Sequence, residues 1–93
     1  VVVFSGWTYR NGNMIILYHG DGYFTHYGHN RINFLEQLDM VDKGDVIGLV
    51  GDTGVSTGPH LHFEVWKEFT PLDPLAFFPE YKTLELESYS EQN

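Results

Sequence analysis

The sequence has 93 residues, of which 42% are hydrophobic, and it carries no cysteine and a formal net charge of −8. This length accommodates one small domain, and the hydrophobic content argues against disorder. Without cysteine, disulfides and thiolate metal ligands are excluded, so any metal site depends on His, Asp and Glu. The acidic balance disfavours nucleic-acid binding, and no apolar run approaches the roughly 20 residues of a membrane span.

Short candidate strands separated by Gly, Asp and Asn dominate the first part of the chain. We predict strands at residues 1–4, 14–18 and 23–29, a turn at 11–13, and a tight hairpin at Asp21-Gly22. The first of these strands begins inside an apolar, β-branched run. We therefore expect the chain to be part of a longer protein.

Residues 30–42 have an ambiguous pattern, because Ile32, Leu35 and Leu38 fit either one or two helical turns or an irregular crossing. Beyond them we predict a strand at 46–50, a polar loop at 51–59 and a strand at 60–66. Several prolines from Pro71 onward indicate that regular structure ends there. We expect residues 75–78 to form a short helix or an apolar plug, and residues 80–93 to form an acidic, polar surface tail or a short edge segment.

Strands without long helices between them predict a mostly β fold, either an antiparallel β-sandwich or a partial barrel. Within it, His60 and His62 are two residues apart on a predicted strand and therefore share a face, with Glu64 next along that face. Two neighbouring imidazoles can divide metal binding and proton transfer between them. The alternative is two polar residues on the wet face of an amphipathic strand. The Gly-rich loop before His60, in which Pro59 fixes φ, favours a site.

The remaining histidines carry weaker signals. Strict alternation along residues 23–29 places His29 on one face of its strand and His26 on the other. Taken alone, His29 is better explained as an exposed or hydrogen-bonded side chain than as part of a site. We assign structural roles to His19, beside the predicted hairpin, and to His26.

Residues 54–64, Gly-Val-Ser-Thr-Gly-Pro-His-Leu-His-Phe-Glu, resemble the C-terminal signature of the LytM/lysostaphin-type zinc metalloendopeptidases. Residues 11–29, which end in Tyr-x-His, resemble an earlier segment of that family, and Lys-Gly-Asp at 43–45 and Gly-Asp-Thr-Gly at 51–54 match the connecting pattern. The resemblance covers about residues 1–74. It implies that residues 1–79 are the C-terminal part of a LytM-type peptidase domain, whose β fold is incomplete without an upstream segment.

By position, the resemblance implies that His62 is the third protein ligand of a catalytic Zn²⁺. It implies that His29 and His60 are catalytic residues that orient and deprotonate the attacking water and stabilise the oxyanion. Tyr27 has a supporting role. The first two ligands of the family form a His-x-x-x-Asp motif, which this chain lacks, so we expect them upstream or on another chain.

The activity implied by the resemblance is zinc-dependent hydrolysis of peptide bonds in bacterial cell-wall peptidoglycan, in the periplasm, in the cell wall or secreted. The expected partners are a peptidoglycan peptide and the missing N-terminal segment, or a related LytM-like subunit in its place. Two alternatives stay open. The chain is either a non-catalytic scaffold or regulatory subunit that pairs with another cell-wall hydrolase, or a structural β domain that completes another subunit. The three histidines together favour the enzyme.

Overall fold

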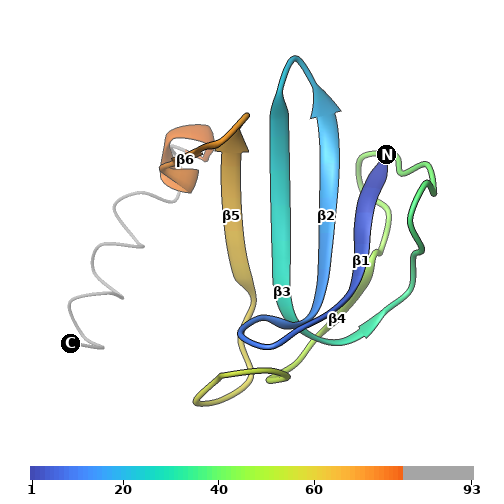
Figure 1. Ribbon diagram of the computed structural model, residues 1–93, viewed down its shortest axis with the longest axis vertical. Coiled ribbons are helices and arrows are strands. Elements are labelled where there is room, and N and C mark those ends of the chain that lie inside the picture. Colours follow the sequence, from blue (N-terminus) through green and yellow to red (C-terminus); the bar gives the residue numbers. More distant parts are fainter. Residues whose placement is uncertain (79–93) are drawn as a thin grey trace.

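The computed structural model describes residues 1–78, which form one open and mostly antiparallel β-sheet. The neighbouring strands follow the order β1-β2-β3-β5-β6, and β4 pairs with β3 (Figure 1). The elements are β1 (Val2–Thr8), β2 (Gly12–Gly20), β3 (Tyr23–Asn33), β4 (Gly48–Val50), β5 (His62–Lys67), β6 (Thr70–Leu72) and the 3-10 helix η1 (Pro74–Phe77). The predicted mostly antiparallel β fold is confirmed. The tail predicted at residues 80–93 lies outside the described residues.

The long hairpin of β2 and β3 is closed by the predicted Asp-Gly turn. Asp21 has φ 53° and Gly22 has φ 84°. Positive φ at both central residues is the geometry of a two-residue turn that matches the right-handed twist of its strands. The sequence signal therefore located this turn correctly.

The ends of the outer strands differ from the prediction. β1 continues past residue 4, and Trp7 and Thr8 pair with Asn13 and Gly12, so the turn lies at residues 9–11 and not at 11–13. β6 was not predicted, because Pro71 has no N–H to donate. It is tolerated here because β6 pairs only with β5 and forms the edge of the sheet. Both β1 and β6 are set by backbone pairing with a neighbouring strand, which cannot be predicted from hydrophobic periodicity.

Residues 34–47 cross irregularly beneath β1 and contain no helix. The N–H of Val2 donates to the Asp39 carbonyl at 2.9 Å, and the N–H of Leu38 donates to the Val2 carbonyl at 2.8 Å. Leu38 has φ 77°, which an α-helix excludes. Of the two alternatives for this segment, the irregular crossing is therefore the one found.

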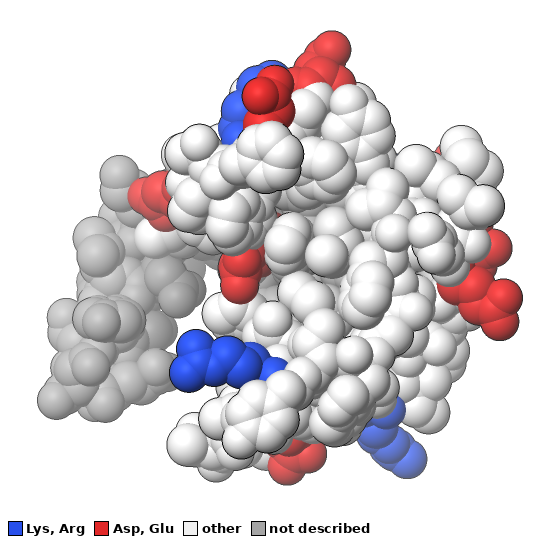
Figure 2. Space-filling view, in the orientation of Figure 1, with Lys and Arg blue, Asp and Glu red and all other residues white. Residues whose placement is uncertain are grey.

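The core lies between the sheet and this crossing. Val2, Ile15 and Leu17 are buried together, and side chains from the crossing and from β3 pack on them (Tyr27, Leu35, Val41, Ile47). The opposite face of the sheet, which we call the outer face, carries Phe24, His26, Glu64 and Trp66 as directly paired cross-strand neighbours. In Figure 2, acidic side chains lie mainly toward the edges of the view, and most of the surface between them is uncharged. No helix within residues 1–78 is long and apolar enough to cross a membrane.

Candidate active site

A β-bulge in β3 sets the position of His29. Asn13 pairs with Asn30 and Ile15 pairs with Tyr27, so one residue of β2 faces two residues of β3, the second of which is His29. His29 has φ 62°, which is uncommon for a residue with a side chain, and it is 5% exposed. Its N–H donates to the Asn11 carbonyl at 2.5 Å. Bulges frequently turn a side chain toward a functional site, and this one breaks the alternation that the sequence predicts for β3.

The imidazole of His29 is fixed by the loop that follows β4. Its Nδ1 lies 2.6 Å from the Thr53 carbonyl oxygen. A carbonyl only accepts hydrogen bonds, so Nδ1 carries the proton and Nε2 of the neutral ring keeps its lone pair. Thr53 is itself held, because its hydroxyl donates to the Asn30 carbonyl at 2.6 Å and accepts from the Asn13 N–H at 3.1 Å.

His60 is held in the same tautomer by its own loop. Its Nδ1 lies 2.8 Å from the Gly58 carbonyl oxygen, so its Nε2 is also the unprotonated nitrogen of the neutral ring. Its N–H donates to the Gly51 carbonyl at 2.9 Å, in a single bridge that precedes β5. The prediction that the strand begins at His60 is therefore two residues early. The ring centroids of His29 and His60 are 4.7 Å apart.

His62 is the first residue of β5 and pairs with Gly28, at the bulge of β3. Its ring centroid is 5.7 Å from that of His29. Its Nε2 hydrogen-bonds the Glu64 carboxylate, and its Nδ1 makes no hydrogen bond within residues 1–78. His62 thus differs from the other two histidines in which ring nitrogen is occupied.

The Glu64 carboxylate is the centre of a second group of side chains on the outer face. The indole N–H of Trp66 donates to it at 2.7 Å, and His26 Nδ1 lies 3.8 Å from the same oxygen. Burial acts to raise the pKa of Glu64, but the hydrogen bonds from Trp66 and His62, with the charges of His62 and His26, lower it below its ordinary value. Burial lowers the pKa of His26, against the attraction of Glu64.

The structure brings together the three histidines predicted for the site, His29, His60 and His62. The other two histidines, His26 and His19, lie outside this group. His26 was predicted on the face opposite His29, but because the bulge breaks the alternation it lies on the outer face beside Glu64, close to the site. His19, near the far end of β2, hydrogen-bonds Thr25 Oγ1 at 2.7 Å.

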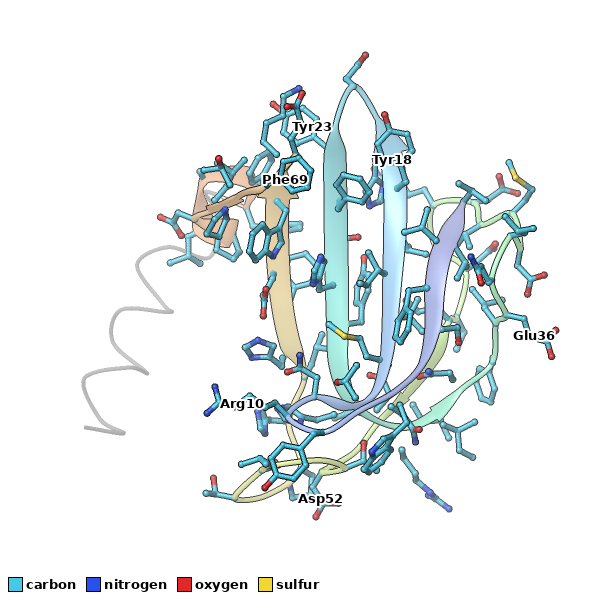
Figure 3. The ribbon with its side chains drawn as sticks, in the orientation of Figure 1. Arg10, Tyr18, Tyr23, Glu36, Asp52 and Phe69 are labelled. Carbon is cyan, nitrogen blue, oxygen red and sulfur yellow. The ribbon has the colours of Figure 1, made fainter. Side chains whose placement is uncertain are left out.

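Sequence reasoning missed Trp66, Thr53 and Asn11. Trp66 had a usable signal, because residues two and four positions beyond His62 on a strand share its face. Thr53 and Asn11 lie in segments that resemble the family pattern, but no signal showed that they reach His29 from 24 and 18 positions away along the chain. Figure 3 shows Arg10 and Asp52, the neighbours of these two residues, at the end of the sheet opposite Tyr23 and Phe69.

The described residues supply part of a metal site. Within residues 1–78, no group of three or more His, Asp and Glu side chains is arranged to hold a metal ion. His62 offers one imidazole nitrogen, Nδ1, that is free of other bonds in this part of the chain. A catalytic zinc takes three protein ligands, so the donor set fits zinc as one ligand of three, with two more contributed from elsewhere.

Comparison with known proteins identifies the family. Residues 1–74 match peptidase family M23. The chain belongs to peptidase family M23. It is 40% identical over 76 residues to the DD-carboxypeptidase/endopeptidase Mpg of Neisseria meningitidis, covering 82% of this chain and 17% of the relative. It is 38% identical over 64 residues to the peptidoglycan DD-endopeptidase ShyA of Vibrio cholerae, covering 69% of this chain and 15% of the relative. The M23 chain thus spans less than a fifth of either relative.

Solved structures share the fold of this M23 chain. It is similar to the catalytic domain of lysostaphin from Staphylococcus simulans (TM-score 0.75, 36% identity, 82% of this chain and 62% of that one). It is also similar to a zinc-containing peptidase from Vibrio cholerae (TM-score 0.74, 36% identity, 77% and 22%). A third similar chain belongs to the SpoIIQ–SpoIIIAH pore-forming complex (TM-score 0.76, 33% identity, 82% and 49%).

Proposed function

We propose that this M23 chain supplies the histidine part of the active site of a zinc-dependent endopeptidase that cleaves peptides of bacterial peptidoglycan. The observation that carries the proposal is the convergence of three imidazoles with different free nitrogens. His29 and His60 each keep Nε2 unprotonated, whereas His62 keeps Nδ1 free of hydrogen bonds within residues 1–78. Two groups are therefore prepared for proton transfer and one for metal binding.

His62 holds the zinc together with a His-x-x-x-Asp pair from residues outside this sequence, which lie upstream or on another chain. When bound, zinc lowers the pKa of a coordinated water toward about 7 and polarises the scissile carbonyl. One of the two rings, His29 or His60, would accept the proton of the attacking water at Nε2. Once protonated, that nitrogen would donate a hydrogen bond to the oxyanion and then return the proton to the leaving amine.

The relatives support the proposed substrate and compartment. ShyA is named for cleaving peptidoglycan, and Mpg for carboxypeptidase and endopeptidase activity. An enzyme of this kind meets its substrate outside the cytoplasm, in the periplasm, in the cell wall or after secretion. We assign residues 1–79 to the C-terminal part of the peptidase domain and residues 80–93 to an acidic tail.

A second candidate is a non-catalytic, scaffolding M23 domain. One observation favours it, because one structural neighbour belongs to a complex of SpoIIQ with SpoIIIAH. In this case the partner takes the place of the substrate, and the three histidines have no catalytic role.

The deciding experiment uses the complete peptidase domain, by which we mean this chain joined to the segment that carries the other two ligands. The domain is incubated with purified peptidoglycan, and released peptides and bound zinc are measured together. We expect one zinc per domain and hydrolysis that a chelator abolishes. His62→Ala should lose both. Stoichiometric zinc in His62→Ala under chelator challenge would disprove the ligand assignment, and absence of hydrolysis by the zinc-loaded domain would favour the scaffold.

A further inference from the structure

The two oxygens of the Glu64 carboxylate have different partners. Oε2 is bonded to Nε2 of His62, and Oε1 accepts the indole N–H of Trp66 at 2.7 Å. His26 Nδ1, at 3.8 Å from Oε1, is too far away for a hydrogen bond. The carboxylate therefore links a proposed zinc ligand to a tryptophan four residues further along β5.

Trp66 fixes the orientation of this carboxylate. An indole nitrogen is a donor only, so the oxygen that faces it must accept. The indole is immobilised by His26, whose ring stacks on it with centroids 5.6 Å apart and an interplanar angle of 16°. Trp66 also pairs directly with Phe24 across the strands. Oε1 is thereby committed to Trp66, and Oε2 is the atom presented to His62.

An ionised carboxylate can only accept hydrogen bonds, so the contact with Oε2 requires a proton on Nε2 of His62. A neutral His62 with a proton on Nε2 has its lone pair on Nδ1. We propose that the Glu64 carboxylate, oriented by Trp66, acts as a positioning group that fixes the tautomer of His62, so that Nδ1 is the nitrogen presented to the metal. The role of Nδ1 as a zinc donor rests on the proposed function, whereas the tautomer does not.

The inference predicts an unusual effect of a conservative change. In Glu64→Gln the amide has one acceptor oxygen and one donor NH₂. The Trp66 N–H requires the oxygen, so the NH₂ group faces His62 Nε2. That nitrogen must then accept, and the proton of the neutral ring moves to Nδ1, where it blocks metal binding. A nearly isosteric substitution should therefore invert the tautomer.

Removing the indole N–H should reverse this effect. In the double variant Glu64→Gln/Trp66→Phe the amide is free to rotate, so its oxygen can turn to His62 and the proton returns to Nε2. Trp66→Phe alone, which keeps the carboxylate as an acceptor, is the matched control and should retain the wild-type tautomer. A purely structural role for Glu64 does not predict rescue by a second substitution that itself removes a hydrogen bond.

The test is nitrogen NMR of the complete peptidase domain, labelled with ¹⁵N-histidine, free of metal and at a pH at which the rings are neutral. The ¹⁵N shifts and two-bond couplings identify the protonated ring nitrogen. We expect Nε2–H at His62 in the wild type, in Trp66→Phe and in the double variant, and Nδ1–H in Glu64→Gln. Zinc affinity, measured by competition with a chelator, should fall on the order of 10–100-fold in Glu64→Gln, as for other partners of ligating histidines, and recover in the double variant.

Several outcomes would overturn the inference. Nδ1–H at His62 in the wild type disproves it without any variant, so it stays testable even if Glu64→Gln fails to fold. Nε2–H in a folded Glu64→Gln, or Nδ1–H in the double variant, also disproves it. If the tautomer switches as expected while the wild-type domain takes up no zinc, the tautomer control stands and the proposed function fails. If the domain binds zinc and hydrolyses its substrate normally but Glu64→Gln does not change the tautomer of His62, the proposed function stands and the tautomer control fails.

Discussion

Nδ1 of His29 lies 2.6 Å from the carbonyl oxygen of Thr53, and this contact joins the bulge of β3 to the loop that follows β4. The contact fixes which of the two ring nitrogens is available for chemistry. Because a backbone carbonyl cannot donate, Nε2 of the neutral ring keeps its lone pair. The Gly58 carbonyl accepts a hydrogen bond from Nδ1 of His60 and fixes the same tautomer there. The first prediction concerns these two rings.

Replacing either His29 or His60 by Ala in the complete peptidase domain should leave the zinc content unchanged and lower kcat/KM on the order of 10²–10⁴-fold. The loss should fall mainly on kcat, because both groups act in the transition state. The double variant should lose less than the product of the single losses, since both rings act on one water and one carbonyl. Peptide release from peptidoglycan and bound zinc are the measurements.

Two results would contradict this assignment. Turnover close to wild type in both variants would remove the catalytic roles and leave the scaffolding function. Loss of zinc in His60→Ala, with zinc retained in His62→Ala, would mean that the ligand and the base of the His60-Leu61-His62 motif are exchanged.

A second prediction concerns the packing of Gly12 against Thr53, the residue whose carbonyl holds His29. Gly12 has φ 61°, and a Cβ there would lie 2.3 Å from Thr53 Oγ1 and 2.4 Å from the Thr53 carbonyl carbon. Gly12→Ala should therefore displace Thr53 and destabilise the domain by about 2–5 kcal/mol, the sum of left-handed strain and overpacking. It should also lower kcat, because Thr53 positions His29.

Gly44→Ala is the matched control for that substitution. Gly44 has φ 92°, but a Cβ there meets nothing within 4 Å. It should cost only the conformational strain, about 1–2 kcal/mol, and leave kcat unchanged. Urea unfolding and peptide release measure both variants, and equal effects of the two would show that the contact with Thr53 is unimportant.

A third prediction concerns acid stability. Burial lowers the pKa of His26 below its ordinary value of about 6.5. The unfolded chain therefore binds this proton more readily than the folded one, and the free energy of unfolding falls as the pH drops from about 7 through 6.5. His26→Phe keeps a ring against Trp66 without a titrating group and should flatten this fall. Urea unfolding at pH 7.5 and 5.5 checks it, and an unchanged slope would assign the pH dependence to other groups.

A fourth prediction concerns the 93-residue chain expressed alone. Only five hydrophobic residues are buried within residues 1–78, whereas Phe69, Met40 and Leu38 are 95%, 81% and 75% exposed. A core of this size gives a thin stability margin. Within residues 1–78, no strand pairs with the outer edge of β1, which Val2 alone joins to the crossing by backbone hydrogen bonds. The isolated chain should aggregate or unfold without cooperativity. A sharp thermal transition of the monomer would contradict this.

The sequence predicted the centre of the fold better than its edges. The β2–β3 hairpin and the shared face of His62 and Glu64 followed from turn chemistry and from period-2 alternation, which are local signals. β6 and the second half of β1 did not, because their pairing depends on a neighbouring strand rather than on their own hydrophobicity. The irregular crossing at residues 34–47 was only one of two alternatives, since its apolar spacing also fits a helix.

The sequence singled out the histidines that lie together but not the geometry that joins them. The family resemblance singled out His29, His60 and His62, and the structure brings them together. Alternation then misplaced His26 relative to His29, because a bulge adds one residue to β3 without any signal in the residue types. The carbonyl groups that fix the tautomers belong to Thr53 and Gly58, and a sequence carries no information on which main-chain oxygen a ring will meet.

Because of the bulge at His29, the site requires a fixed number of residues between Tyr27 and Asn30 as well as the histidine itself. β3 fits one more residue than β2 opposite Met14, and that residue is the histidine. Deleting Gly28 would retain all three histidines but remove the bulge, so that His29 alone would face Met14 and would lose the positive φ with which its ring reaches the Thr53 carbonyl. Such a protein would keep its histidines but not the Tyr-x-His spacing. Among related chains, an insertion or deletion between Tyr27 and Asn30 should therefore be a better indicator of lost activity than most substitutions.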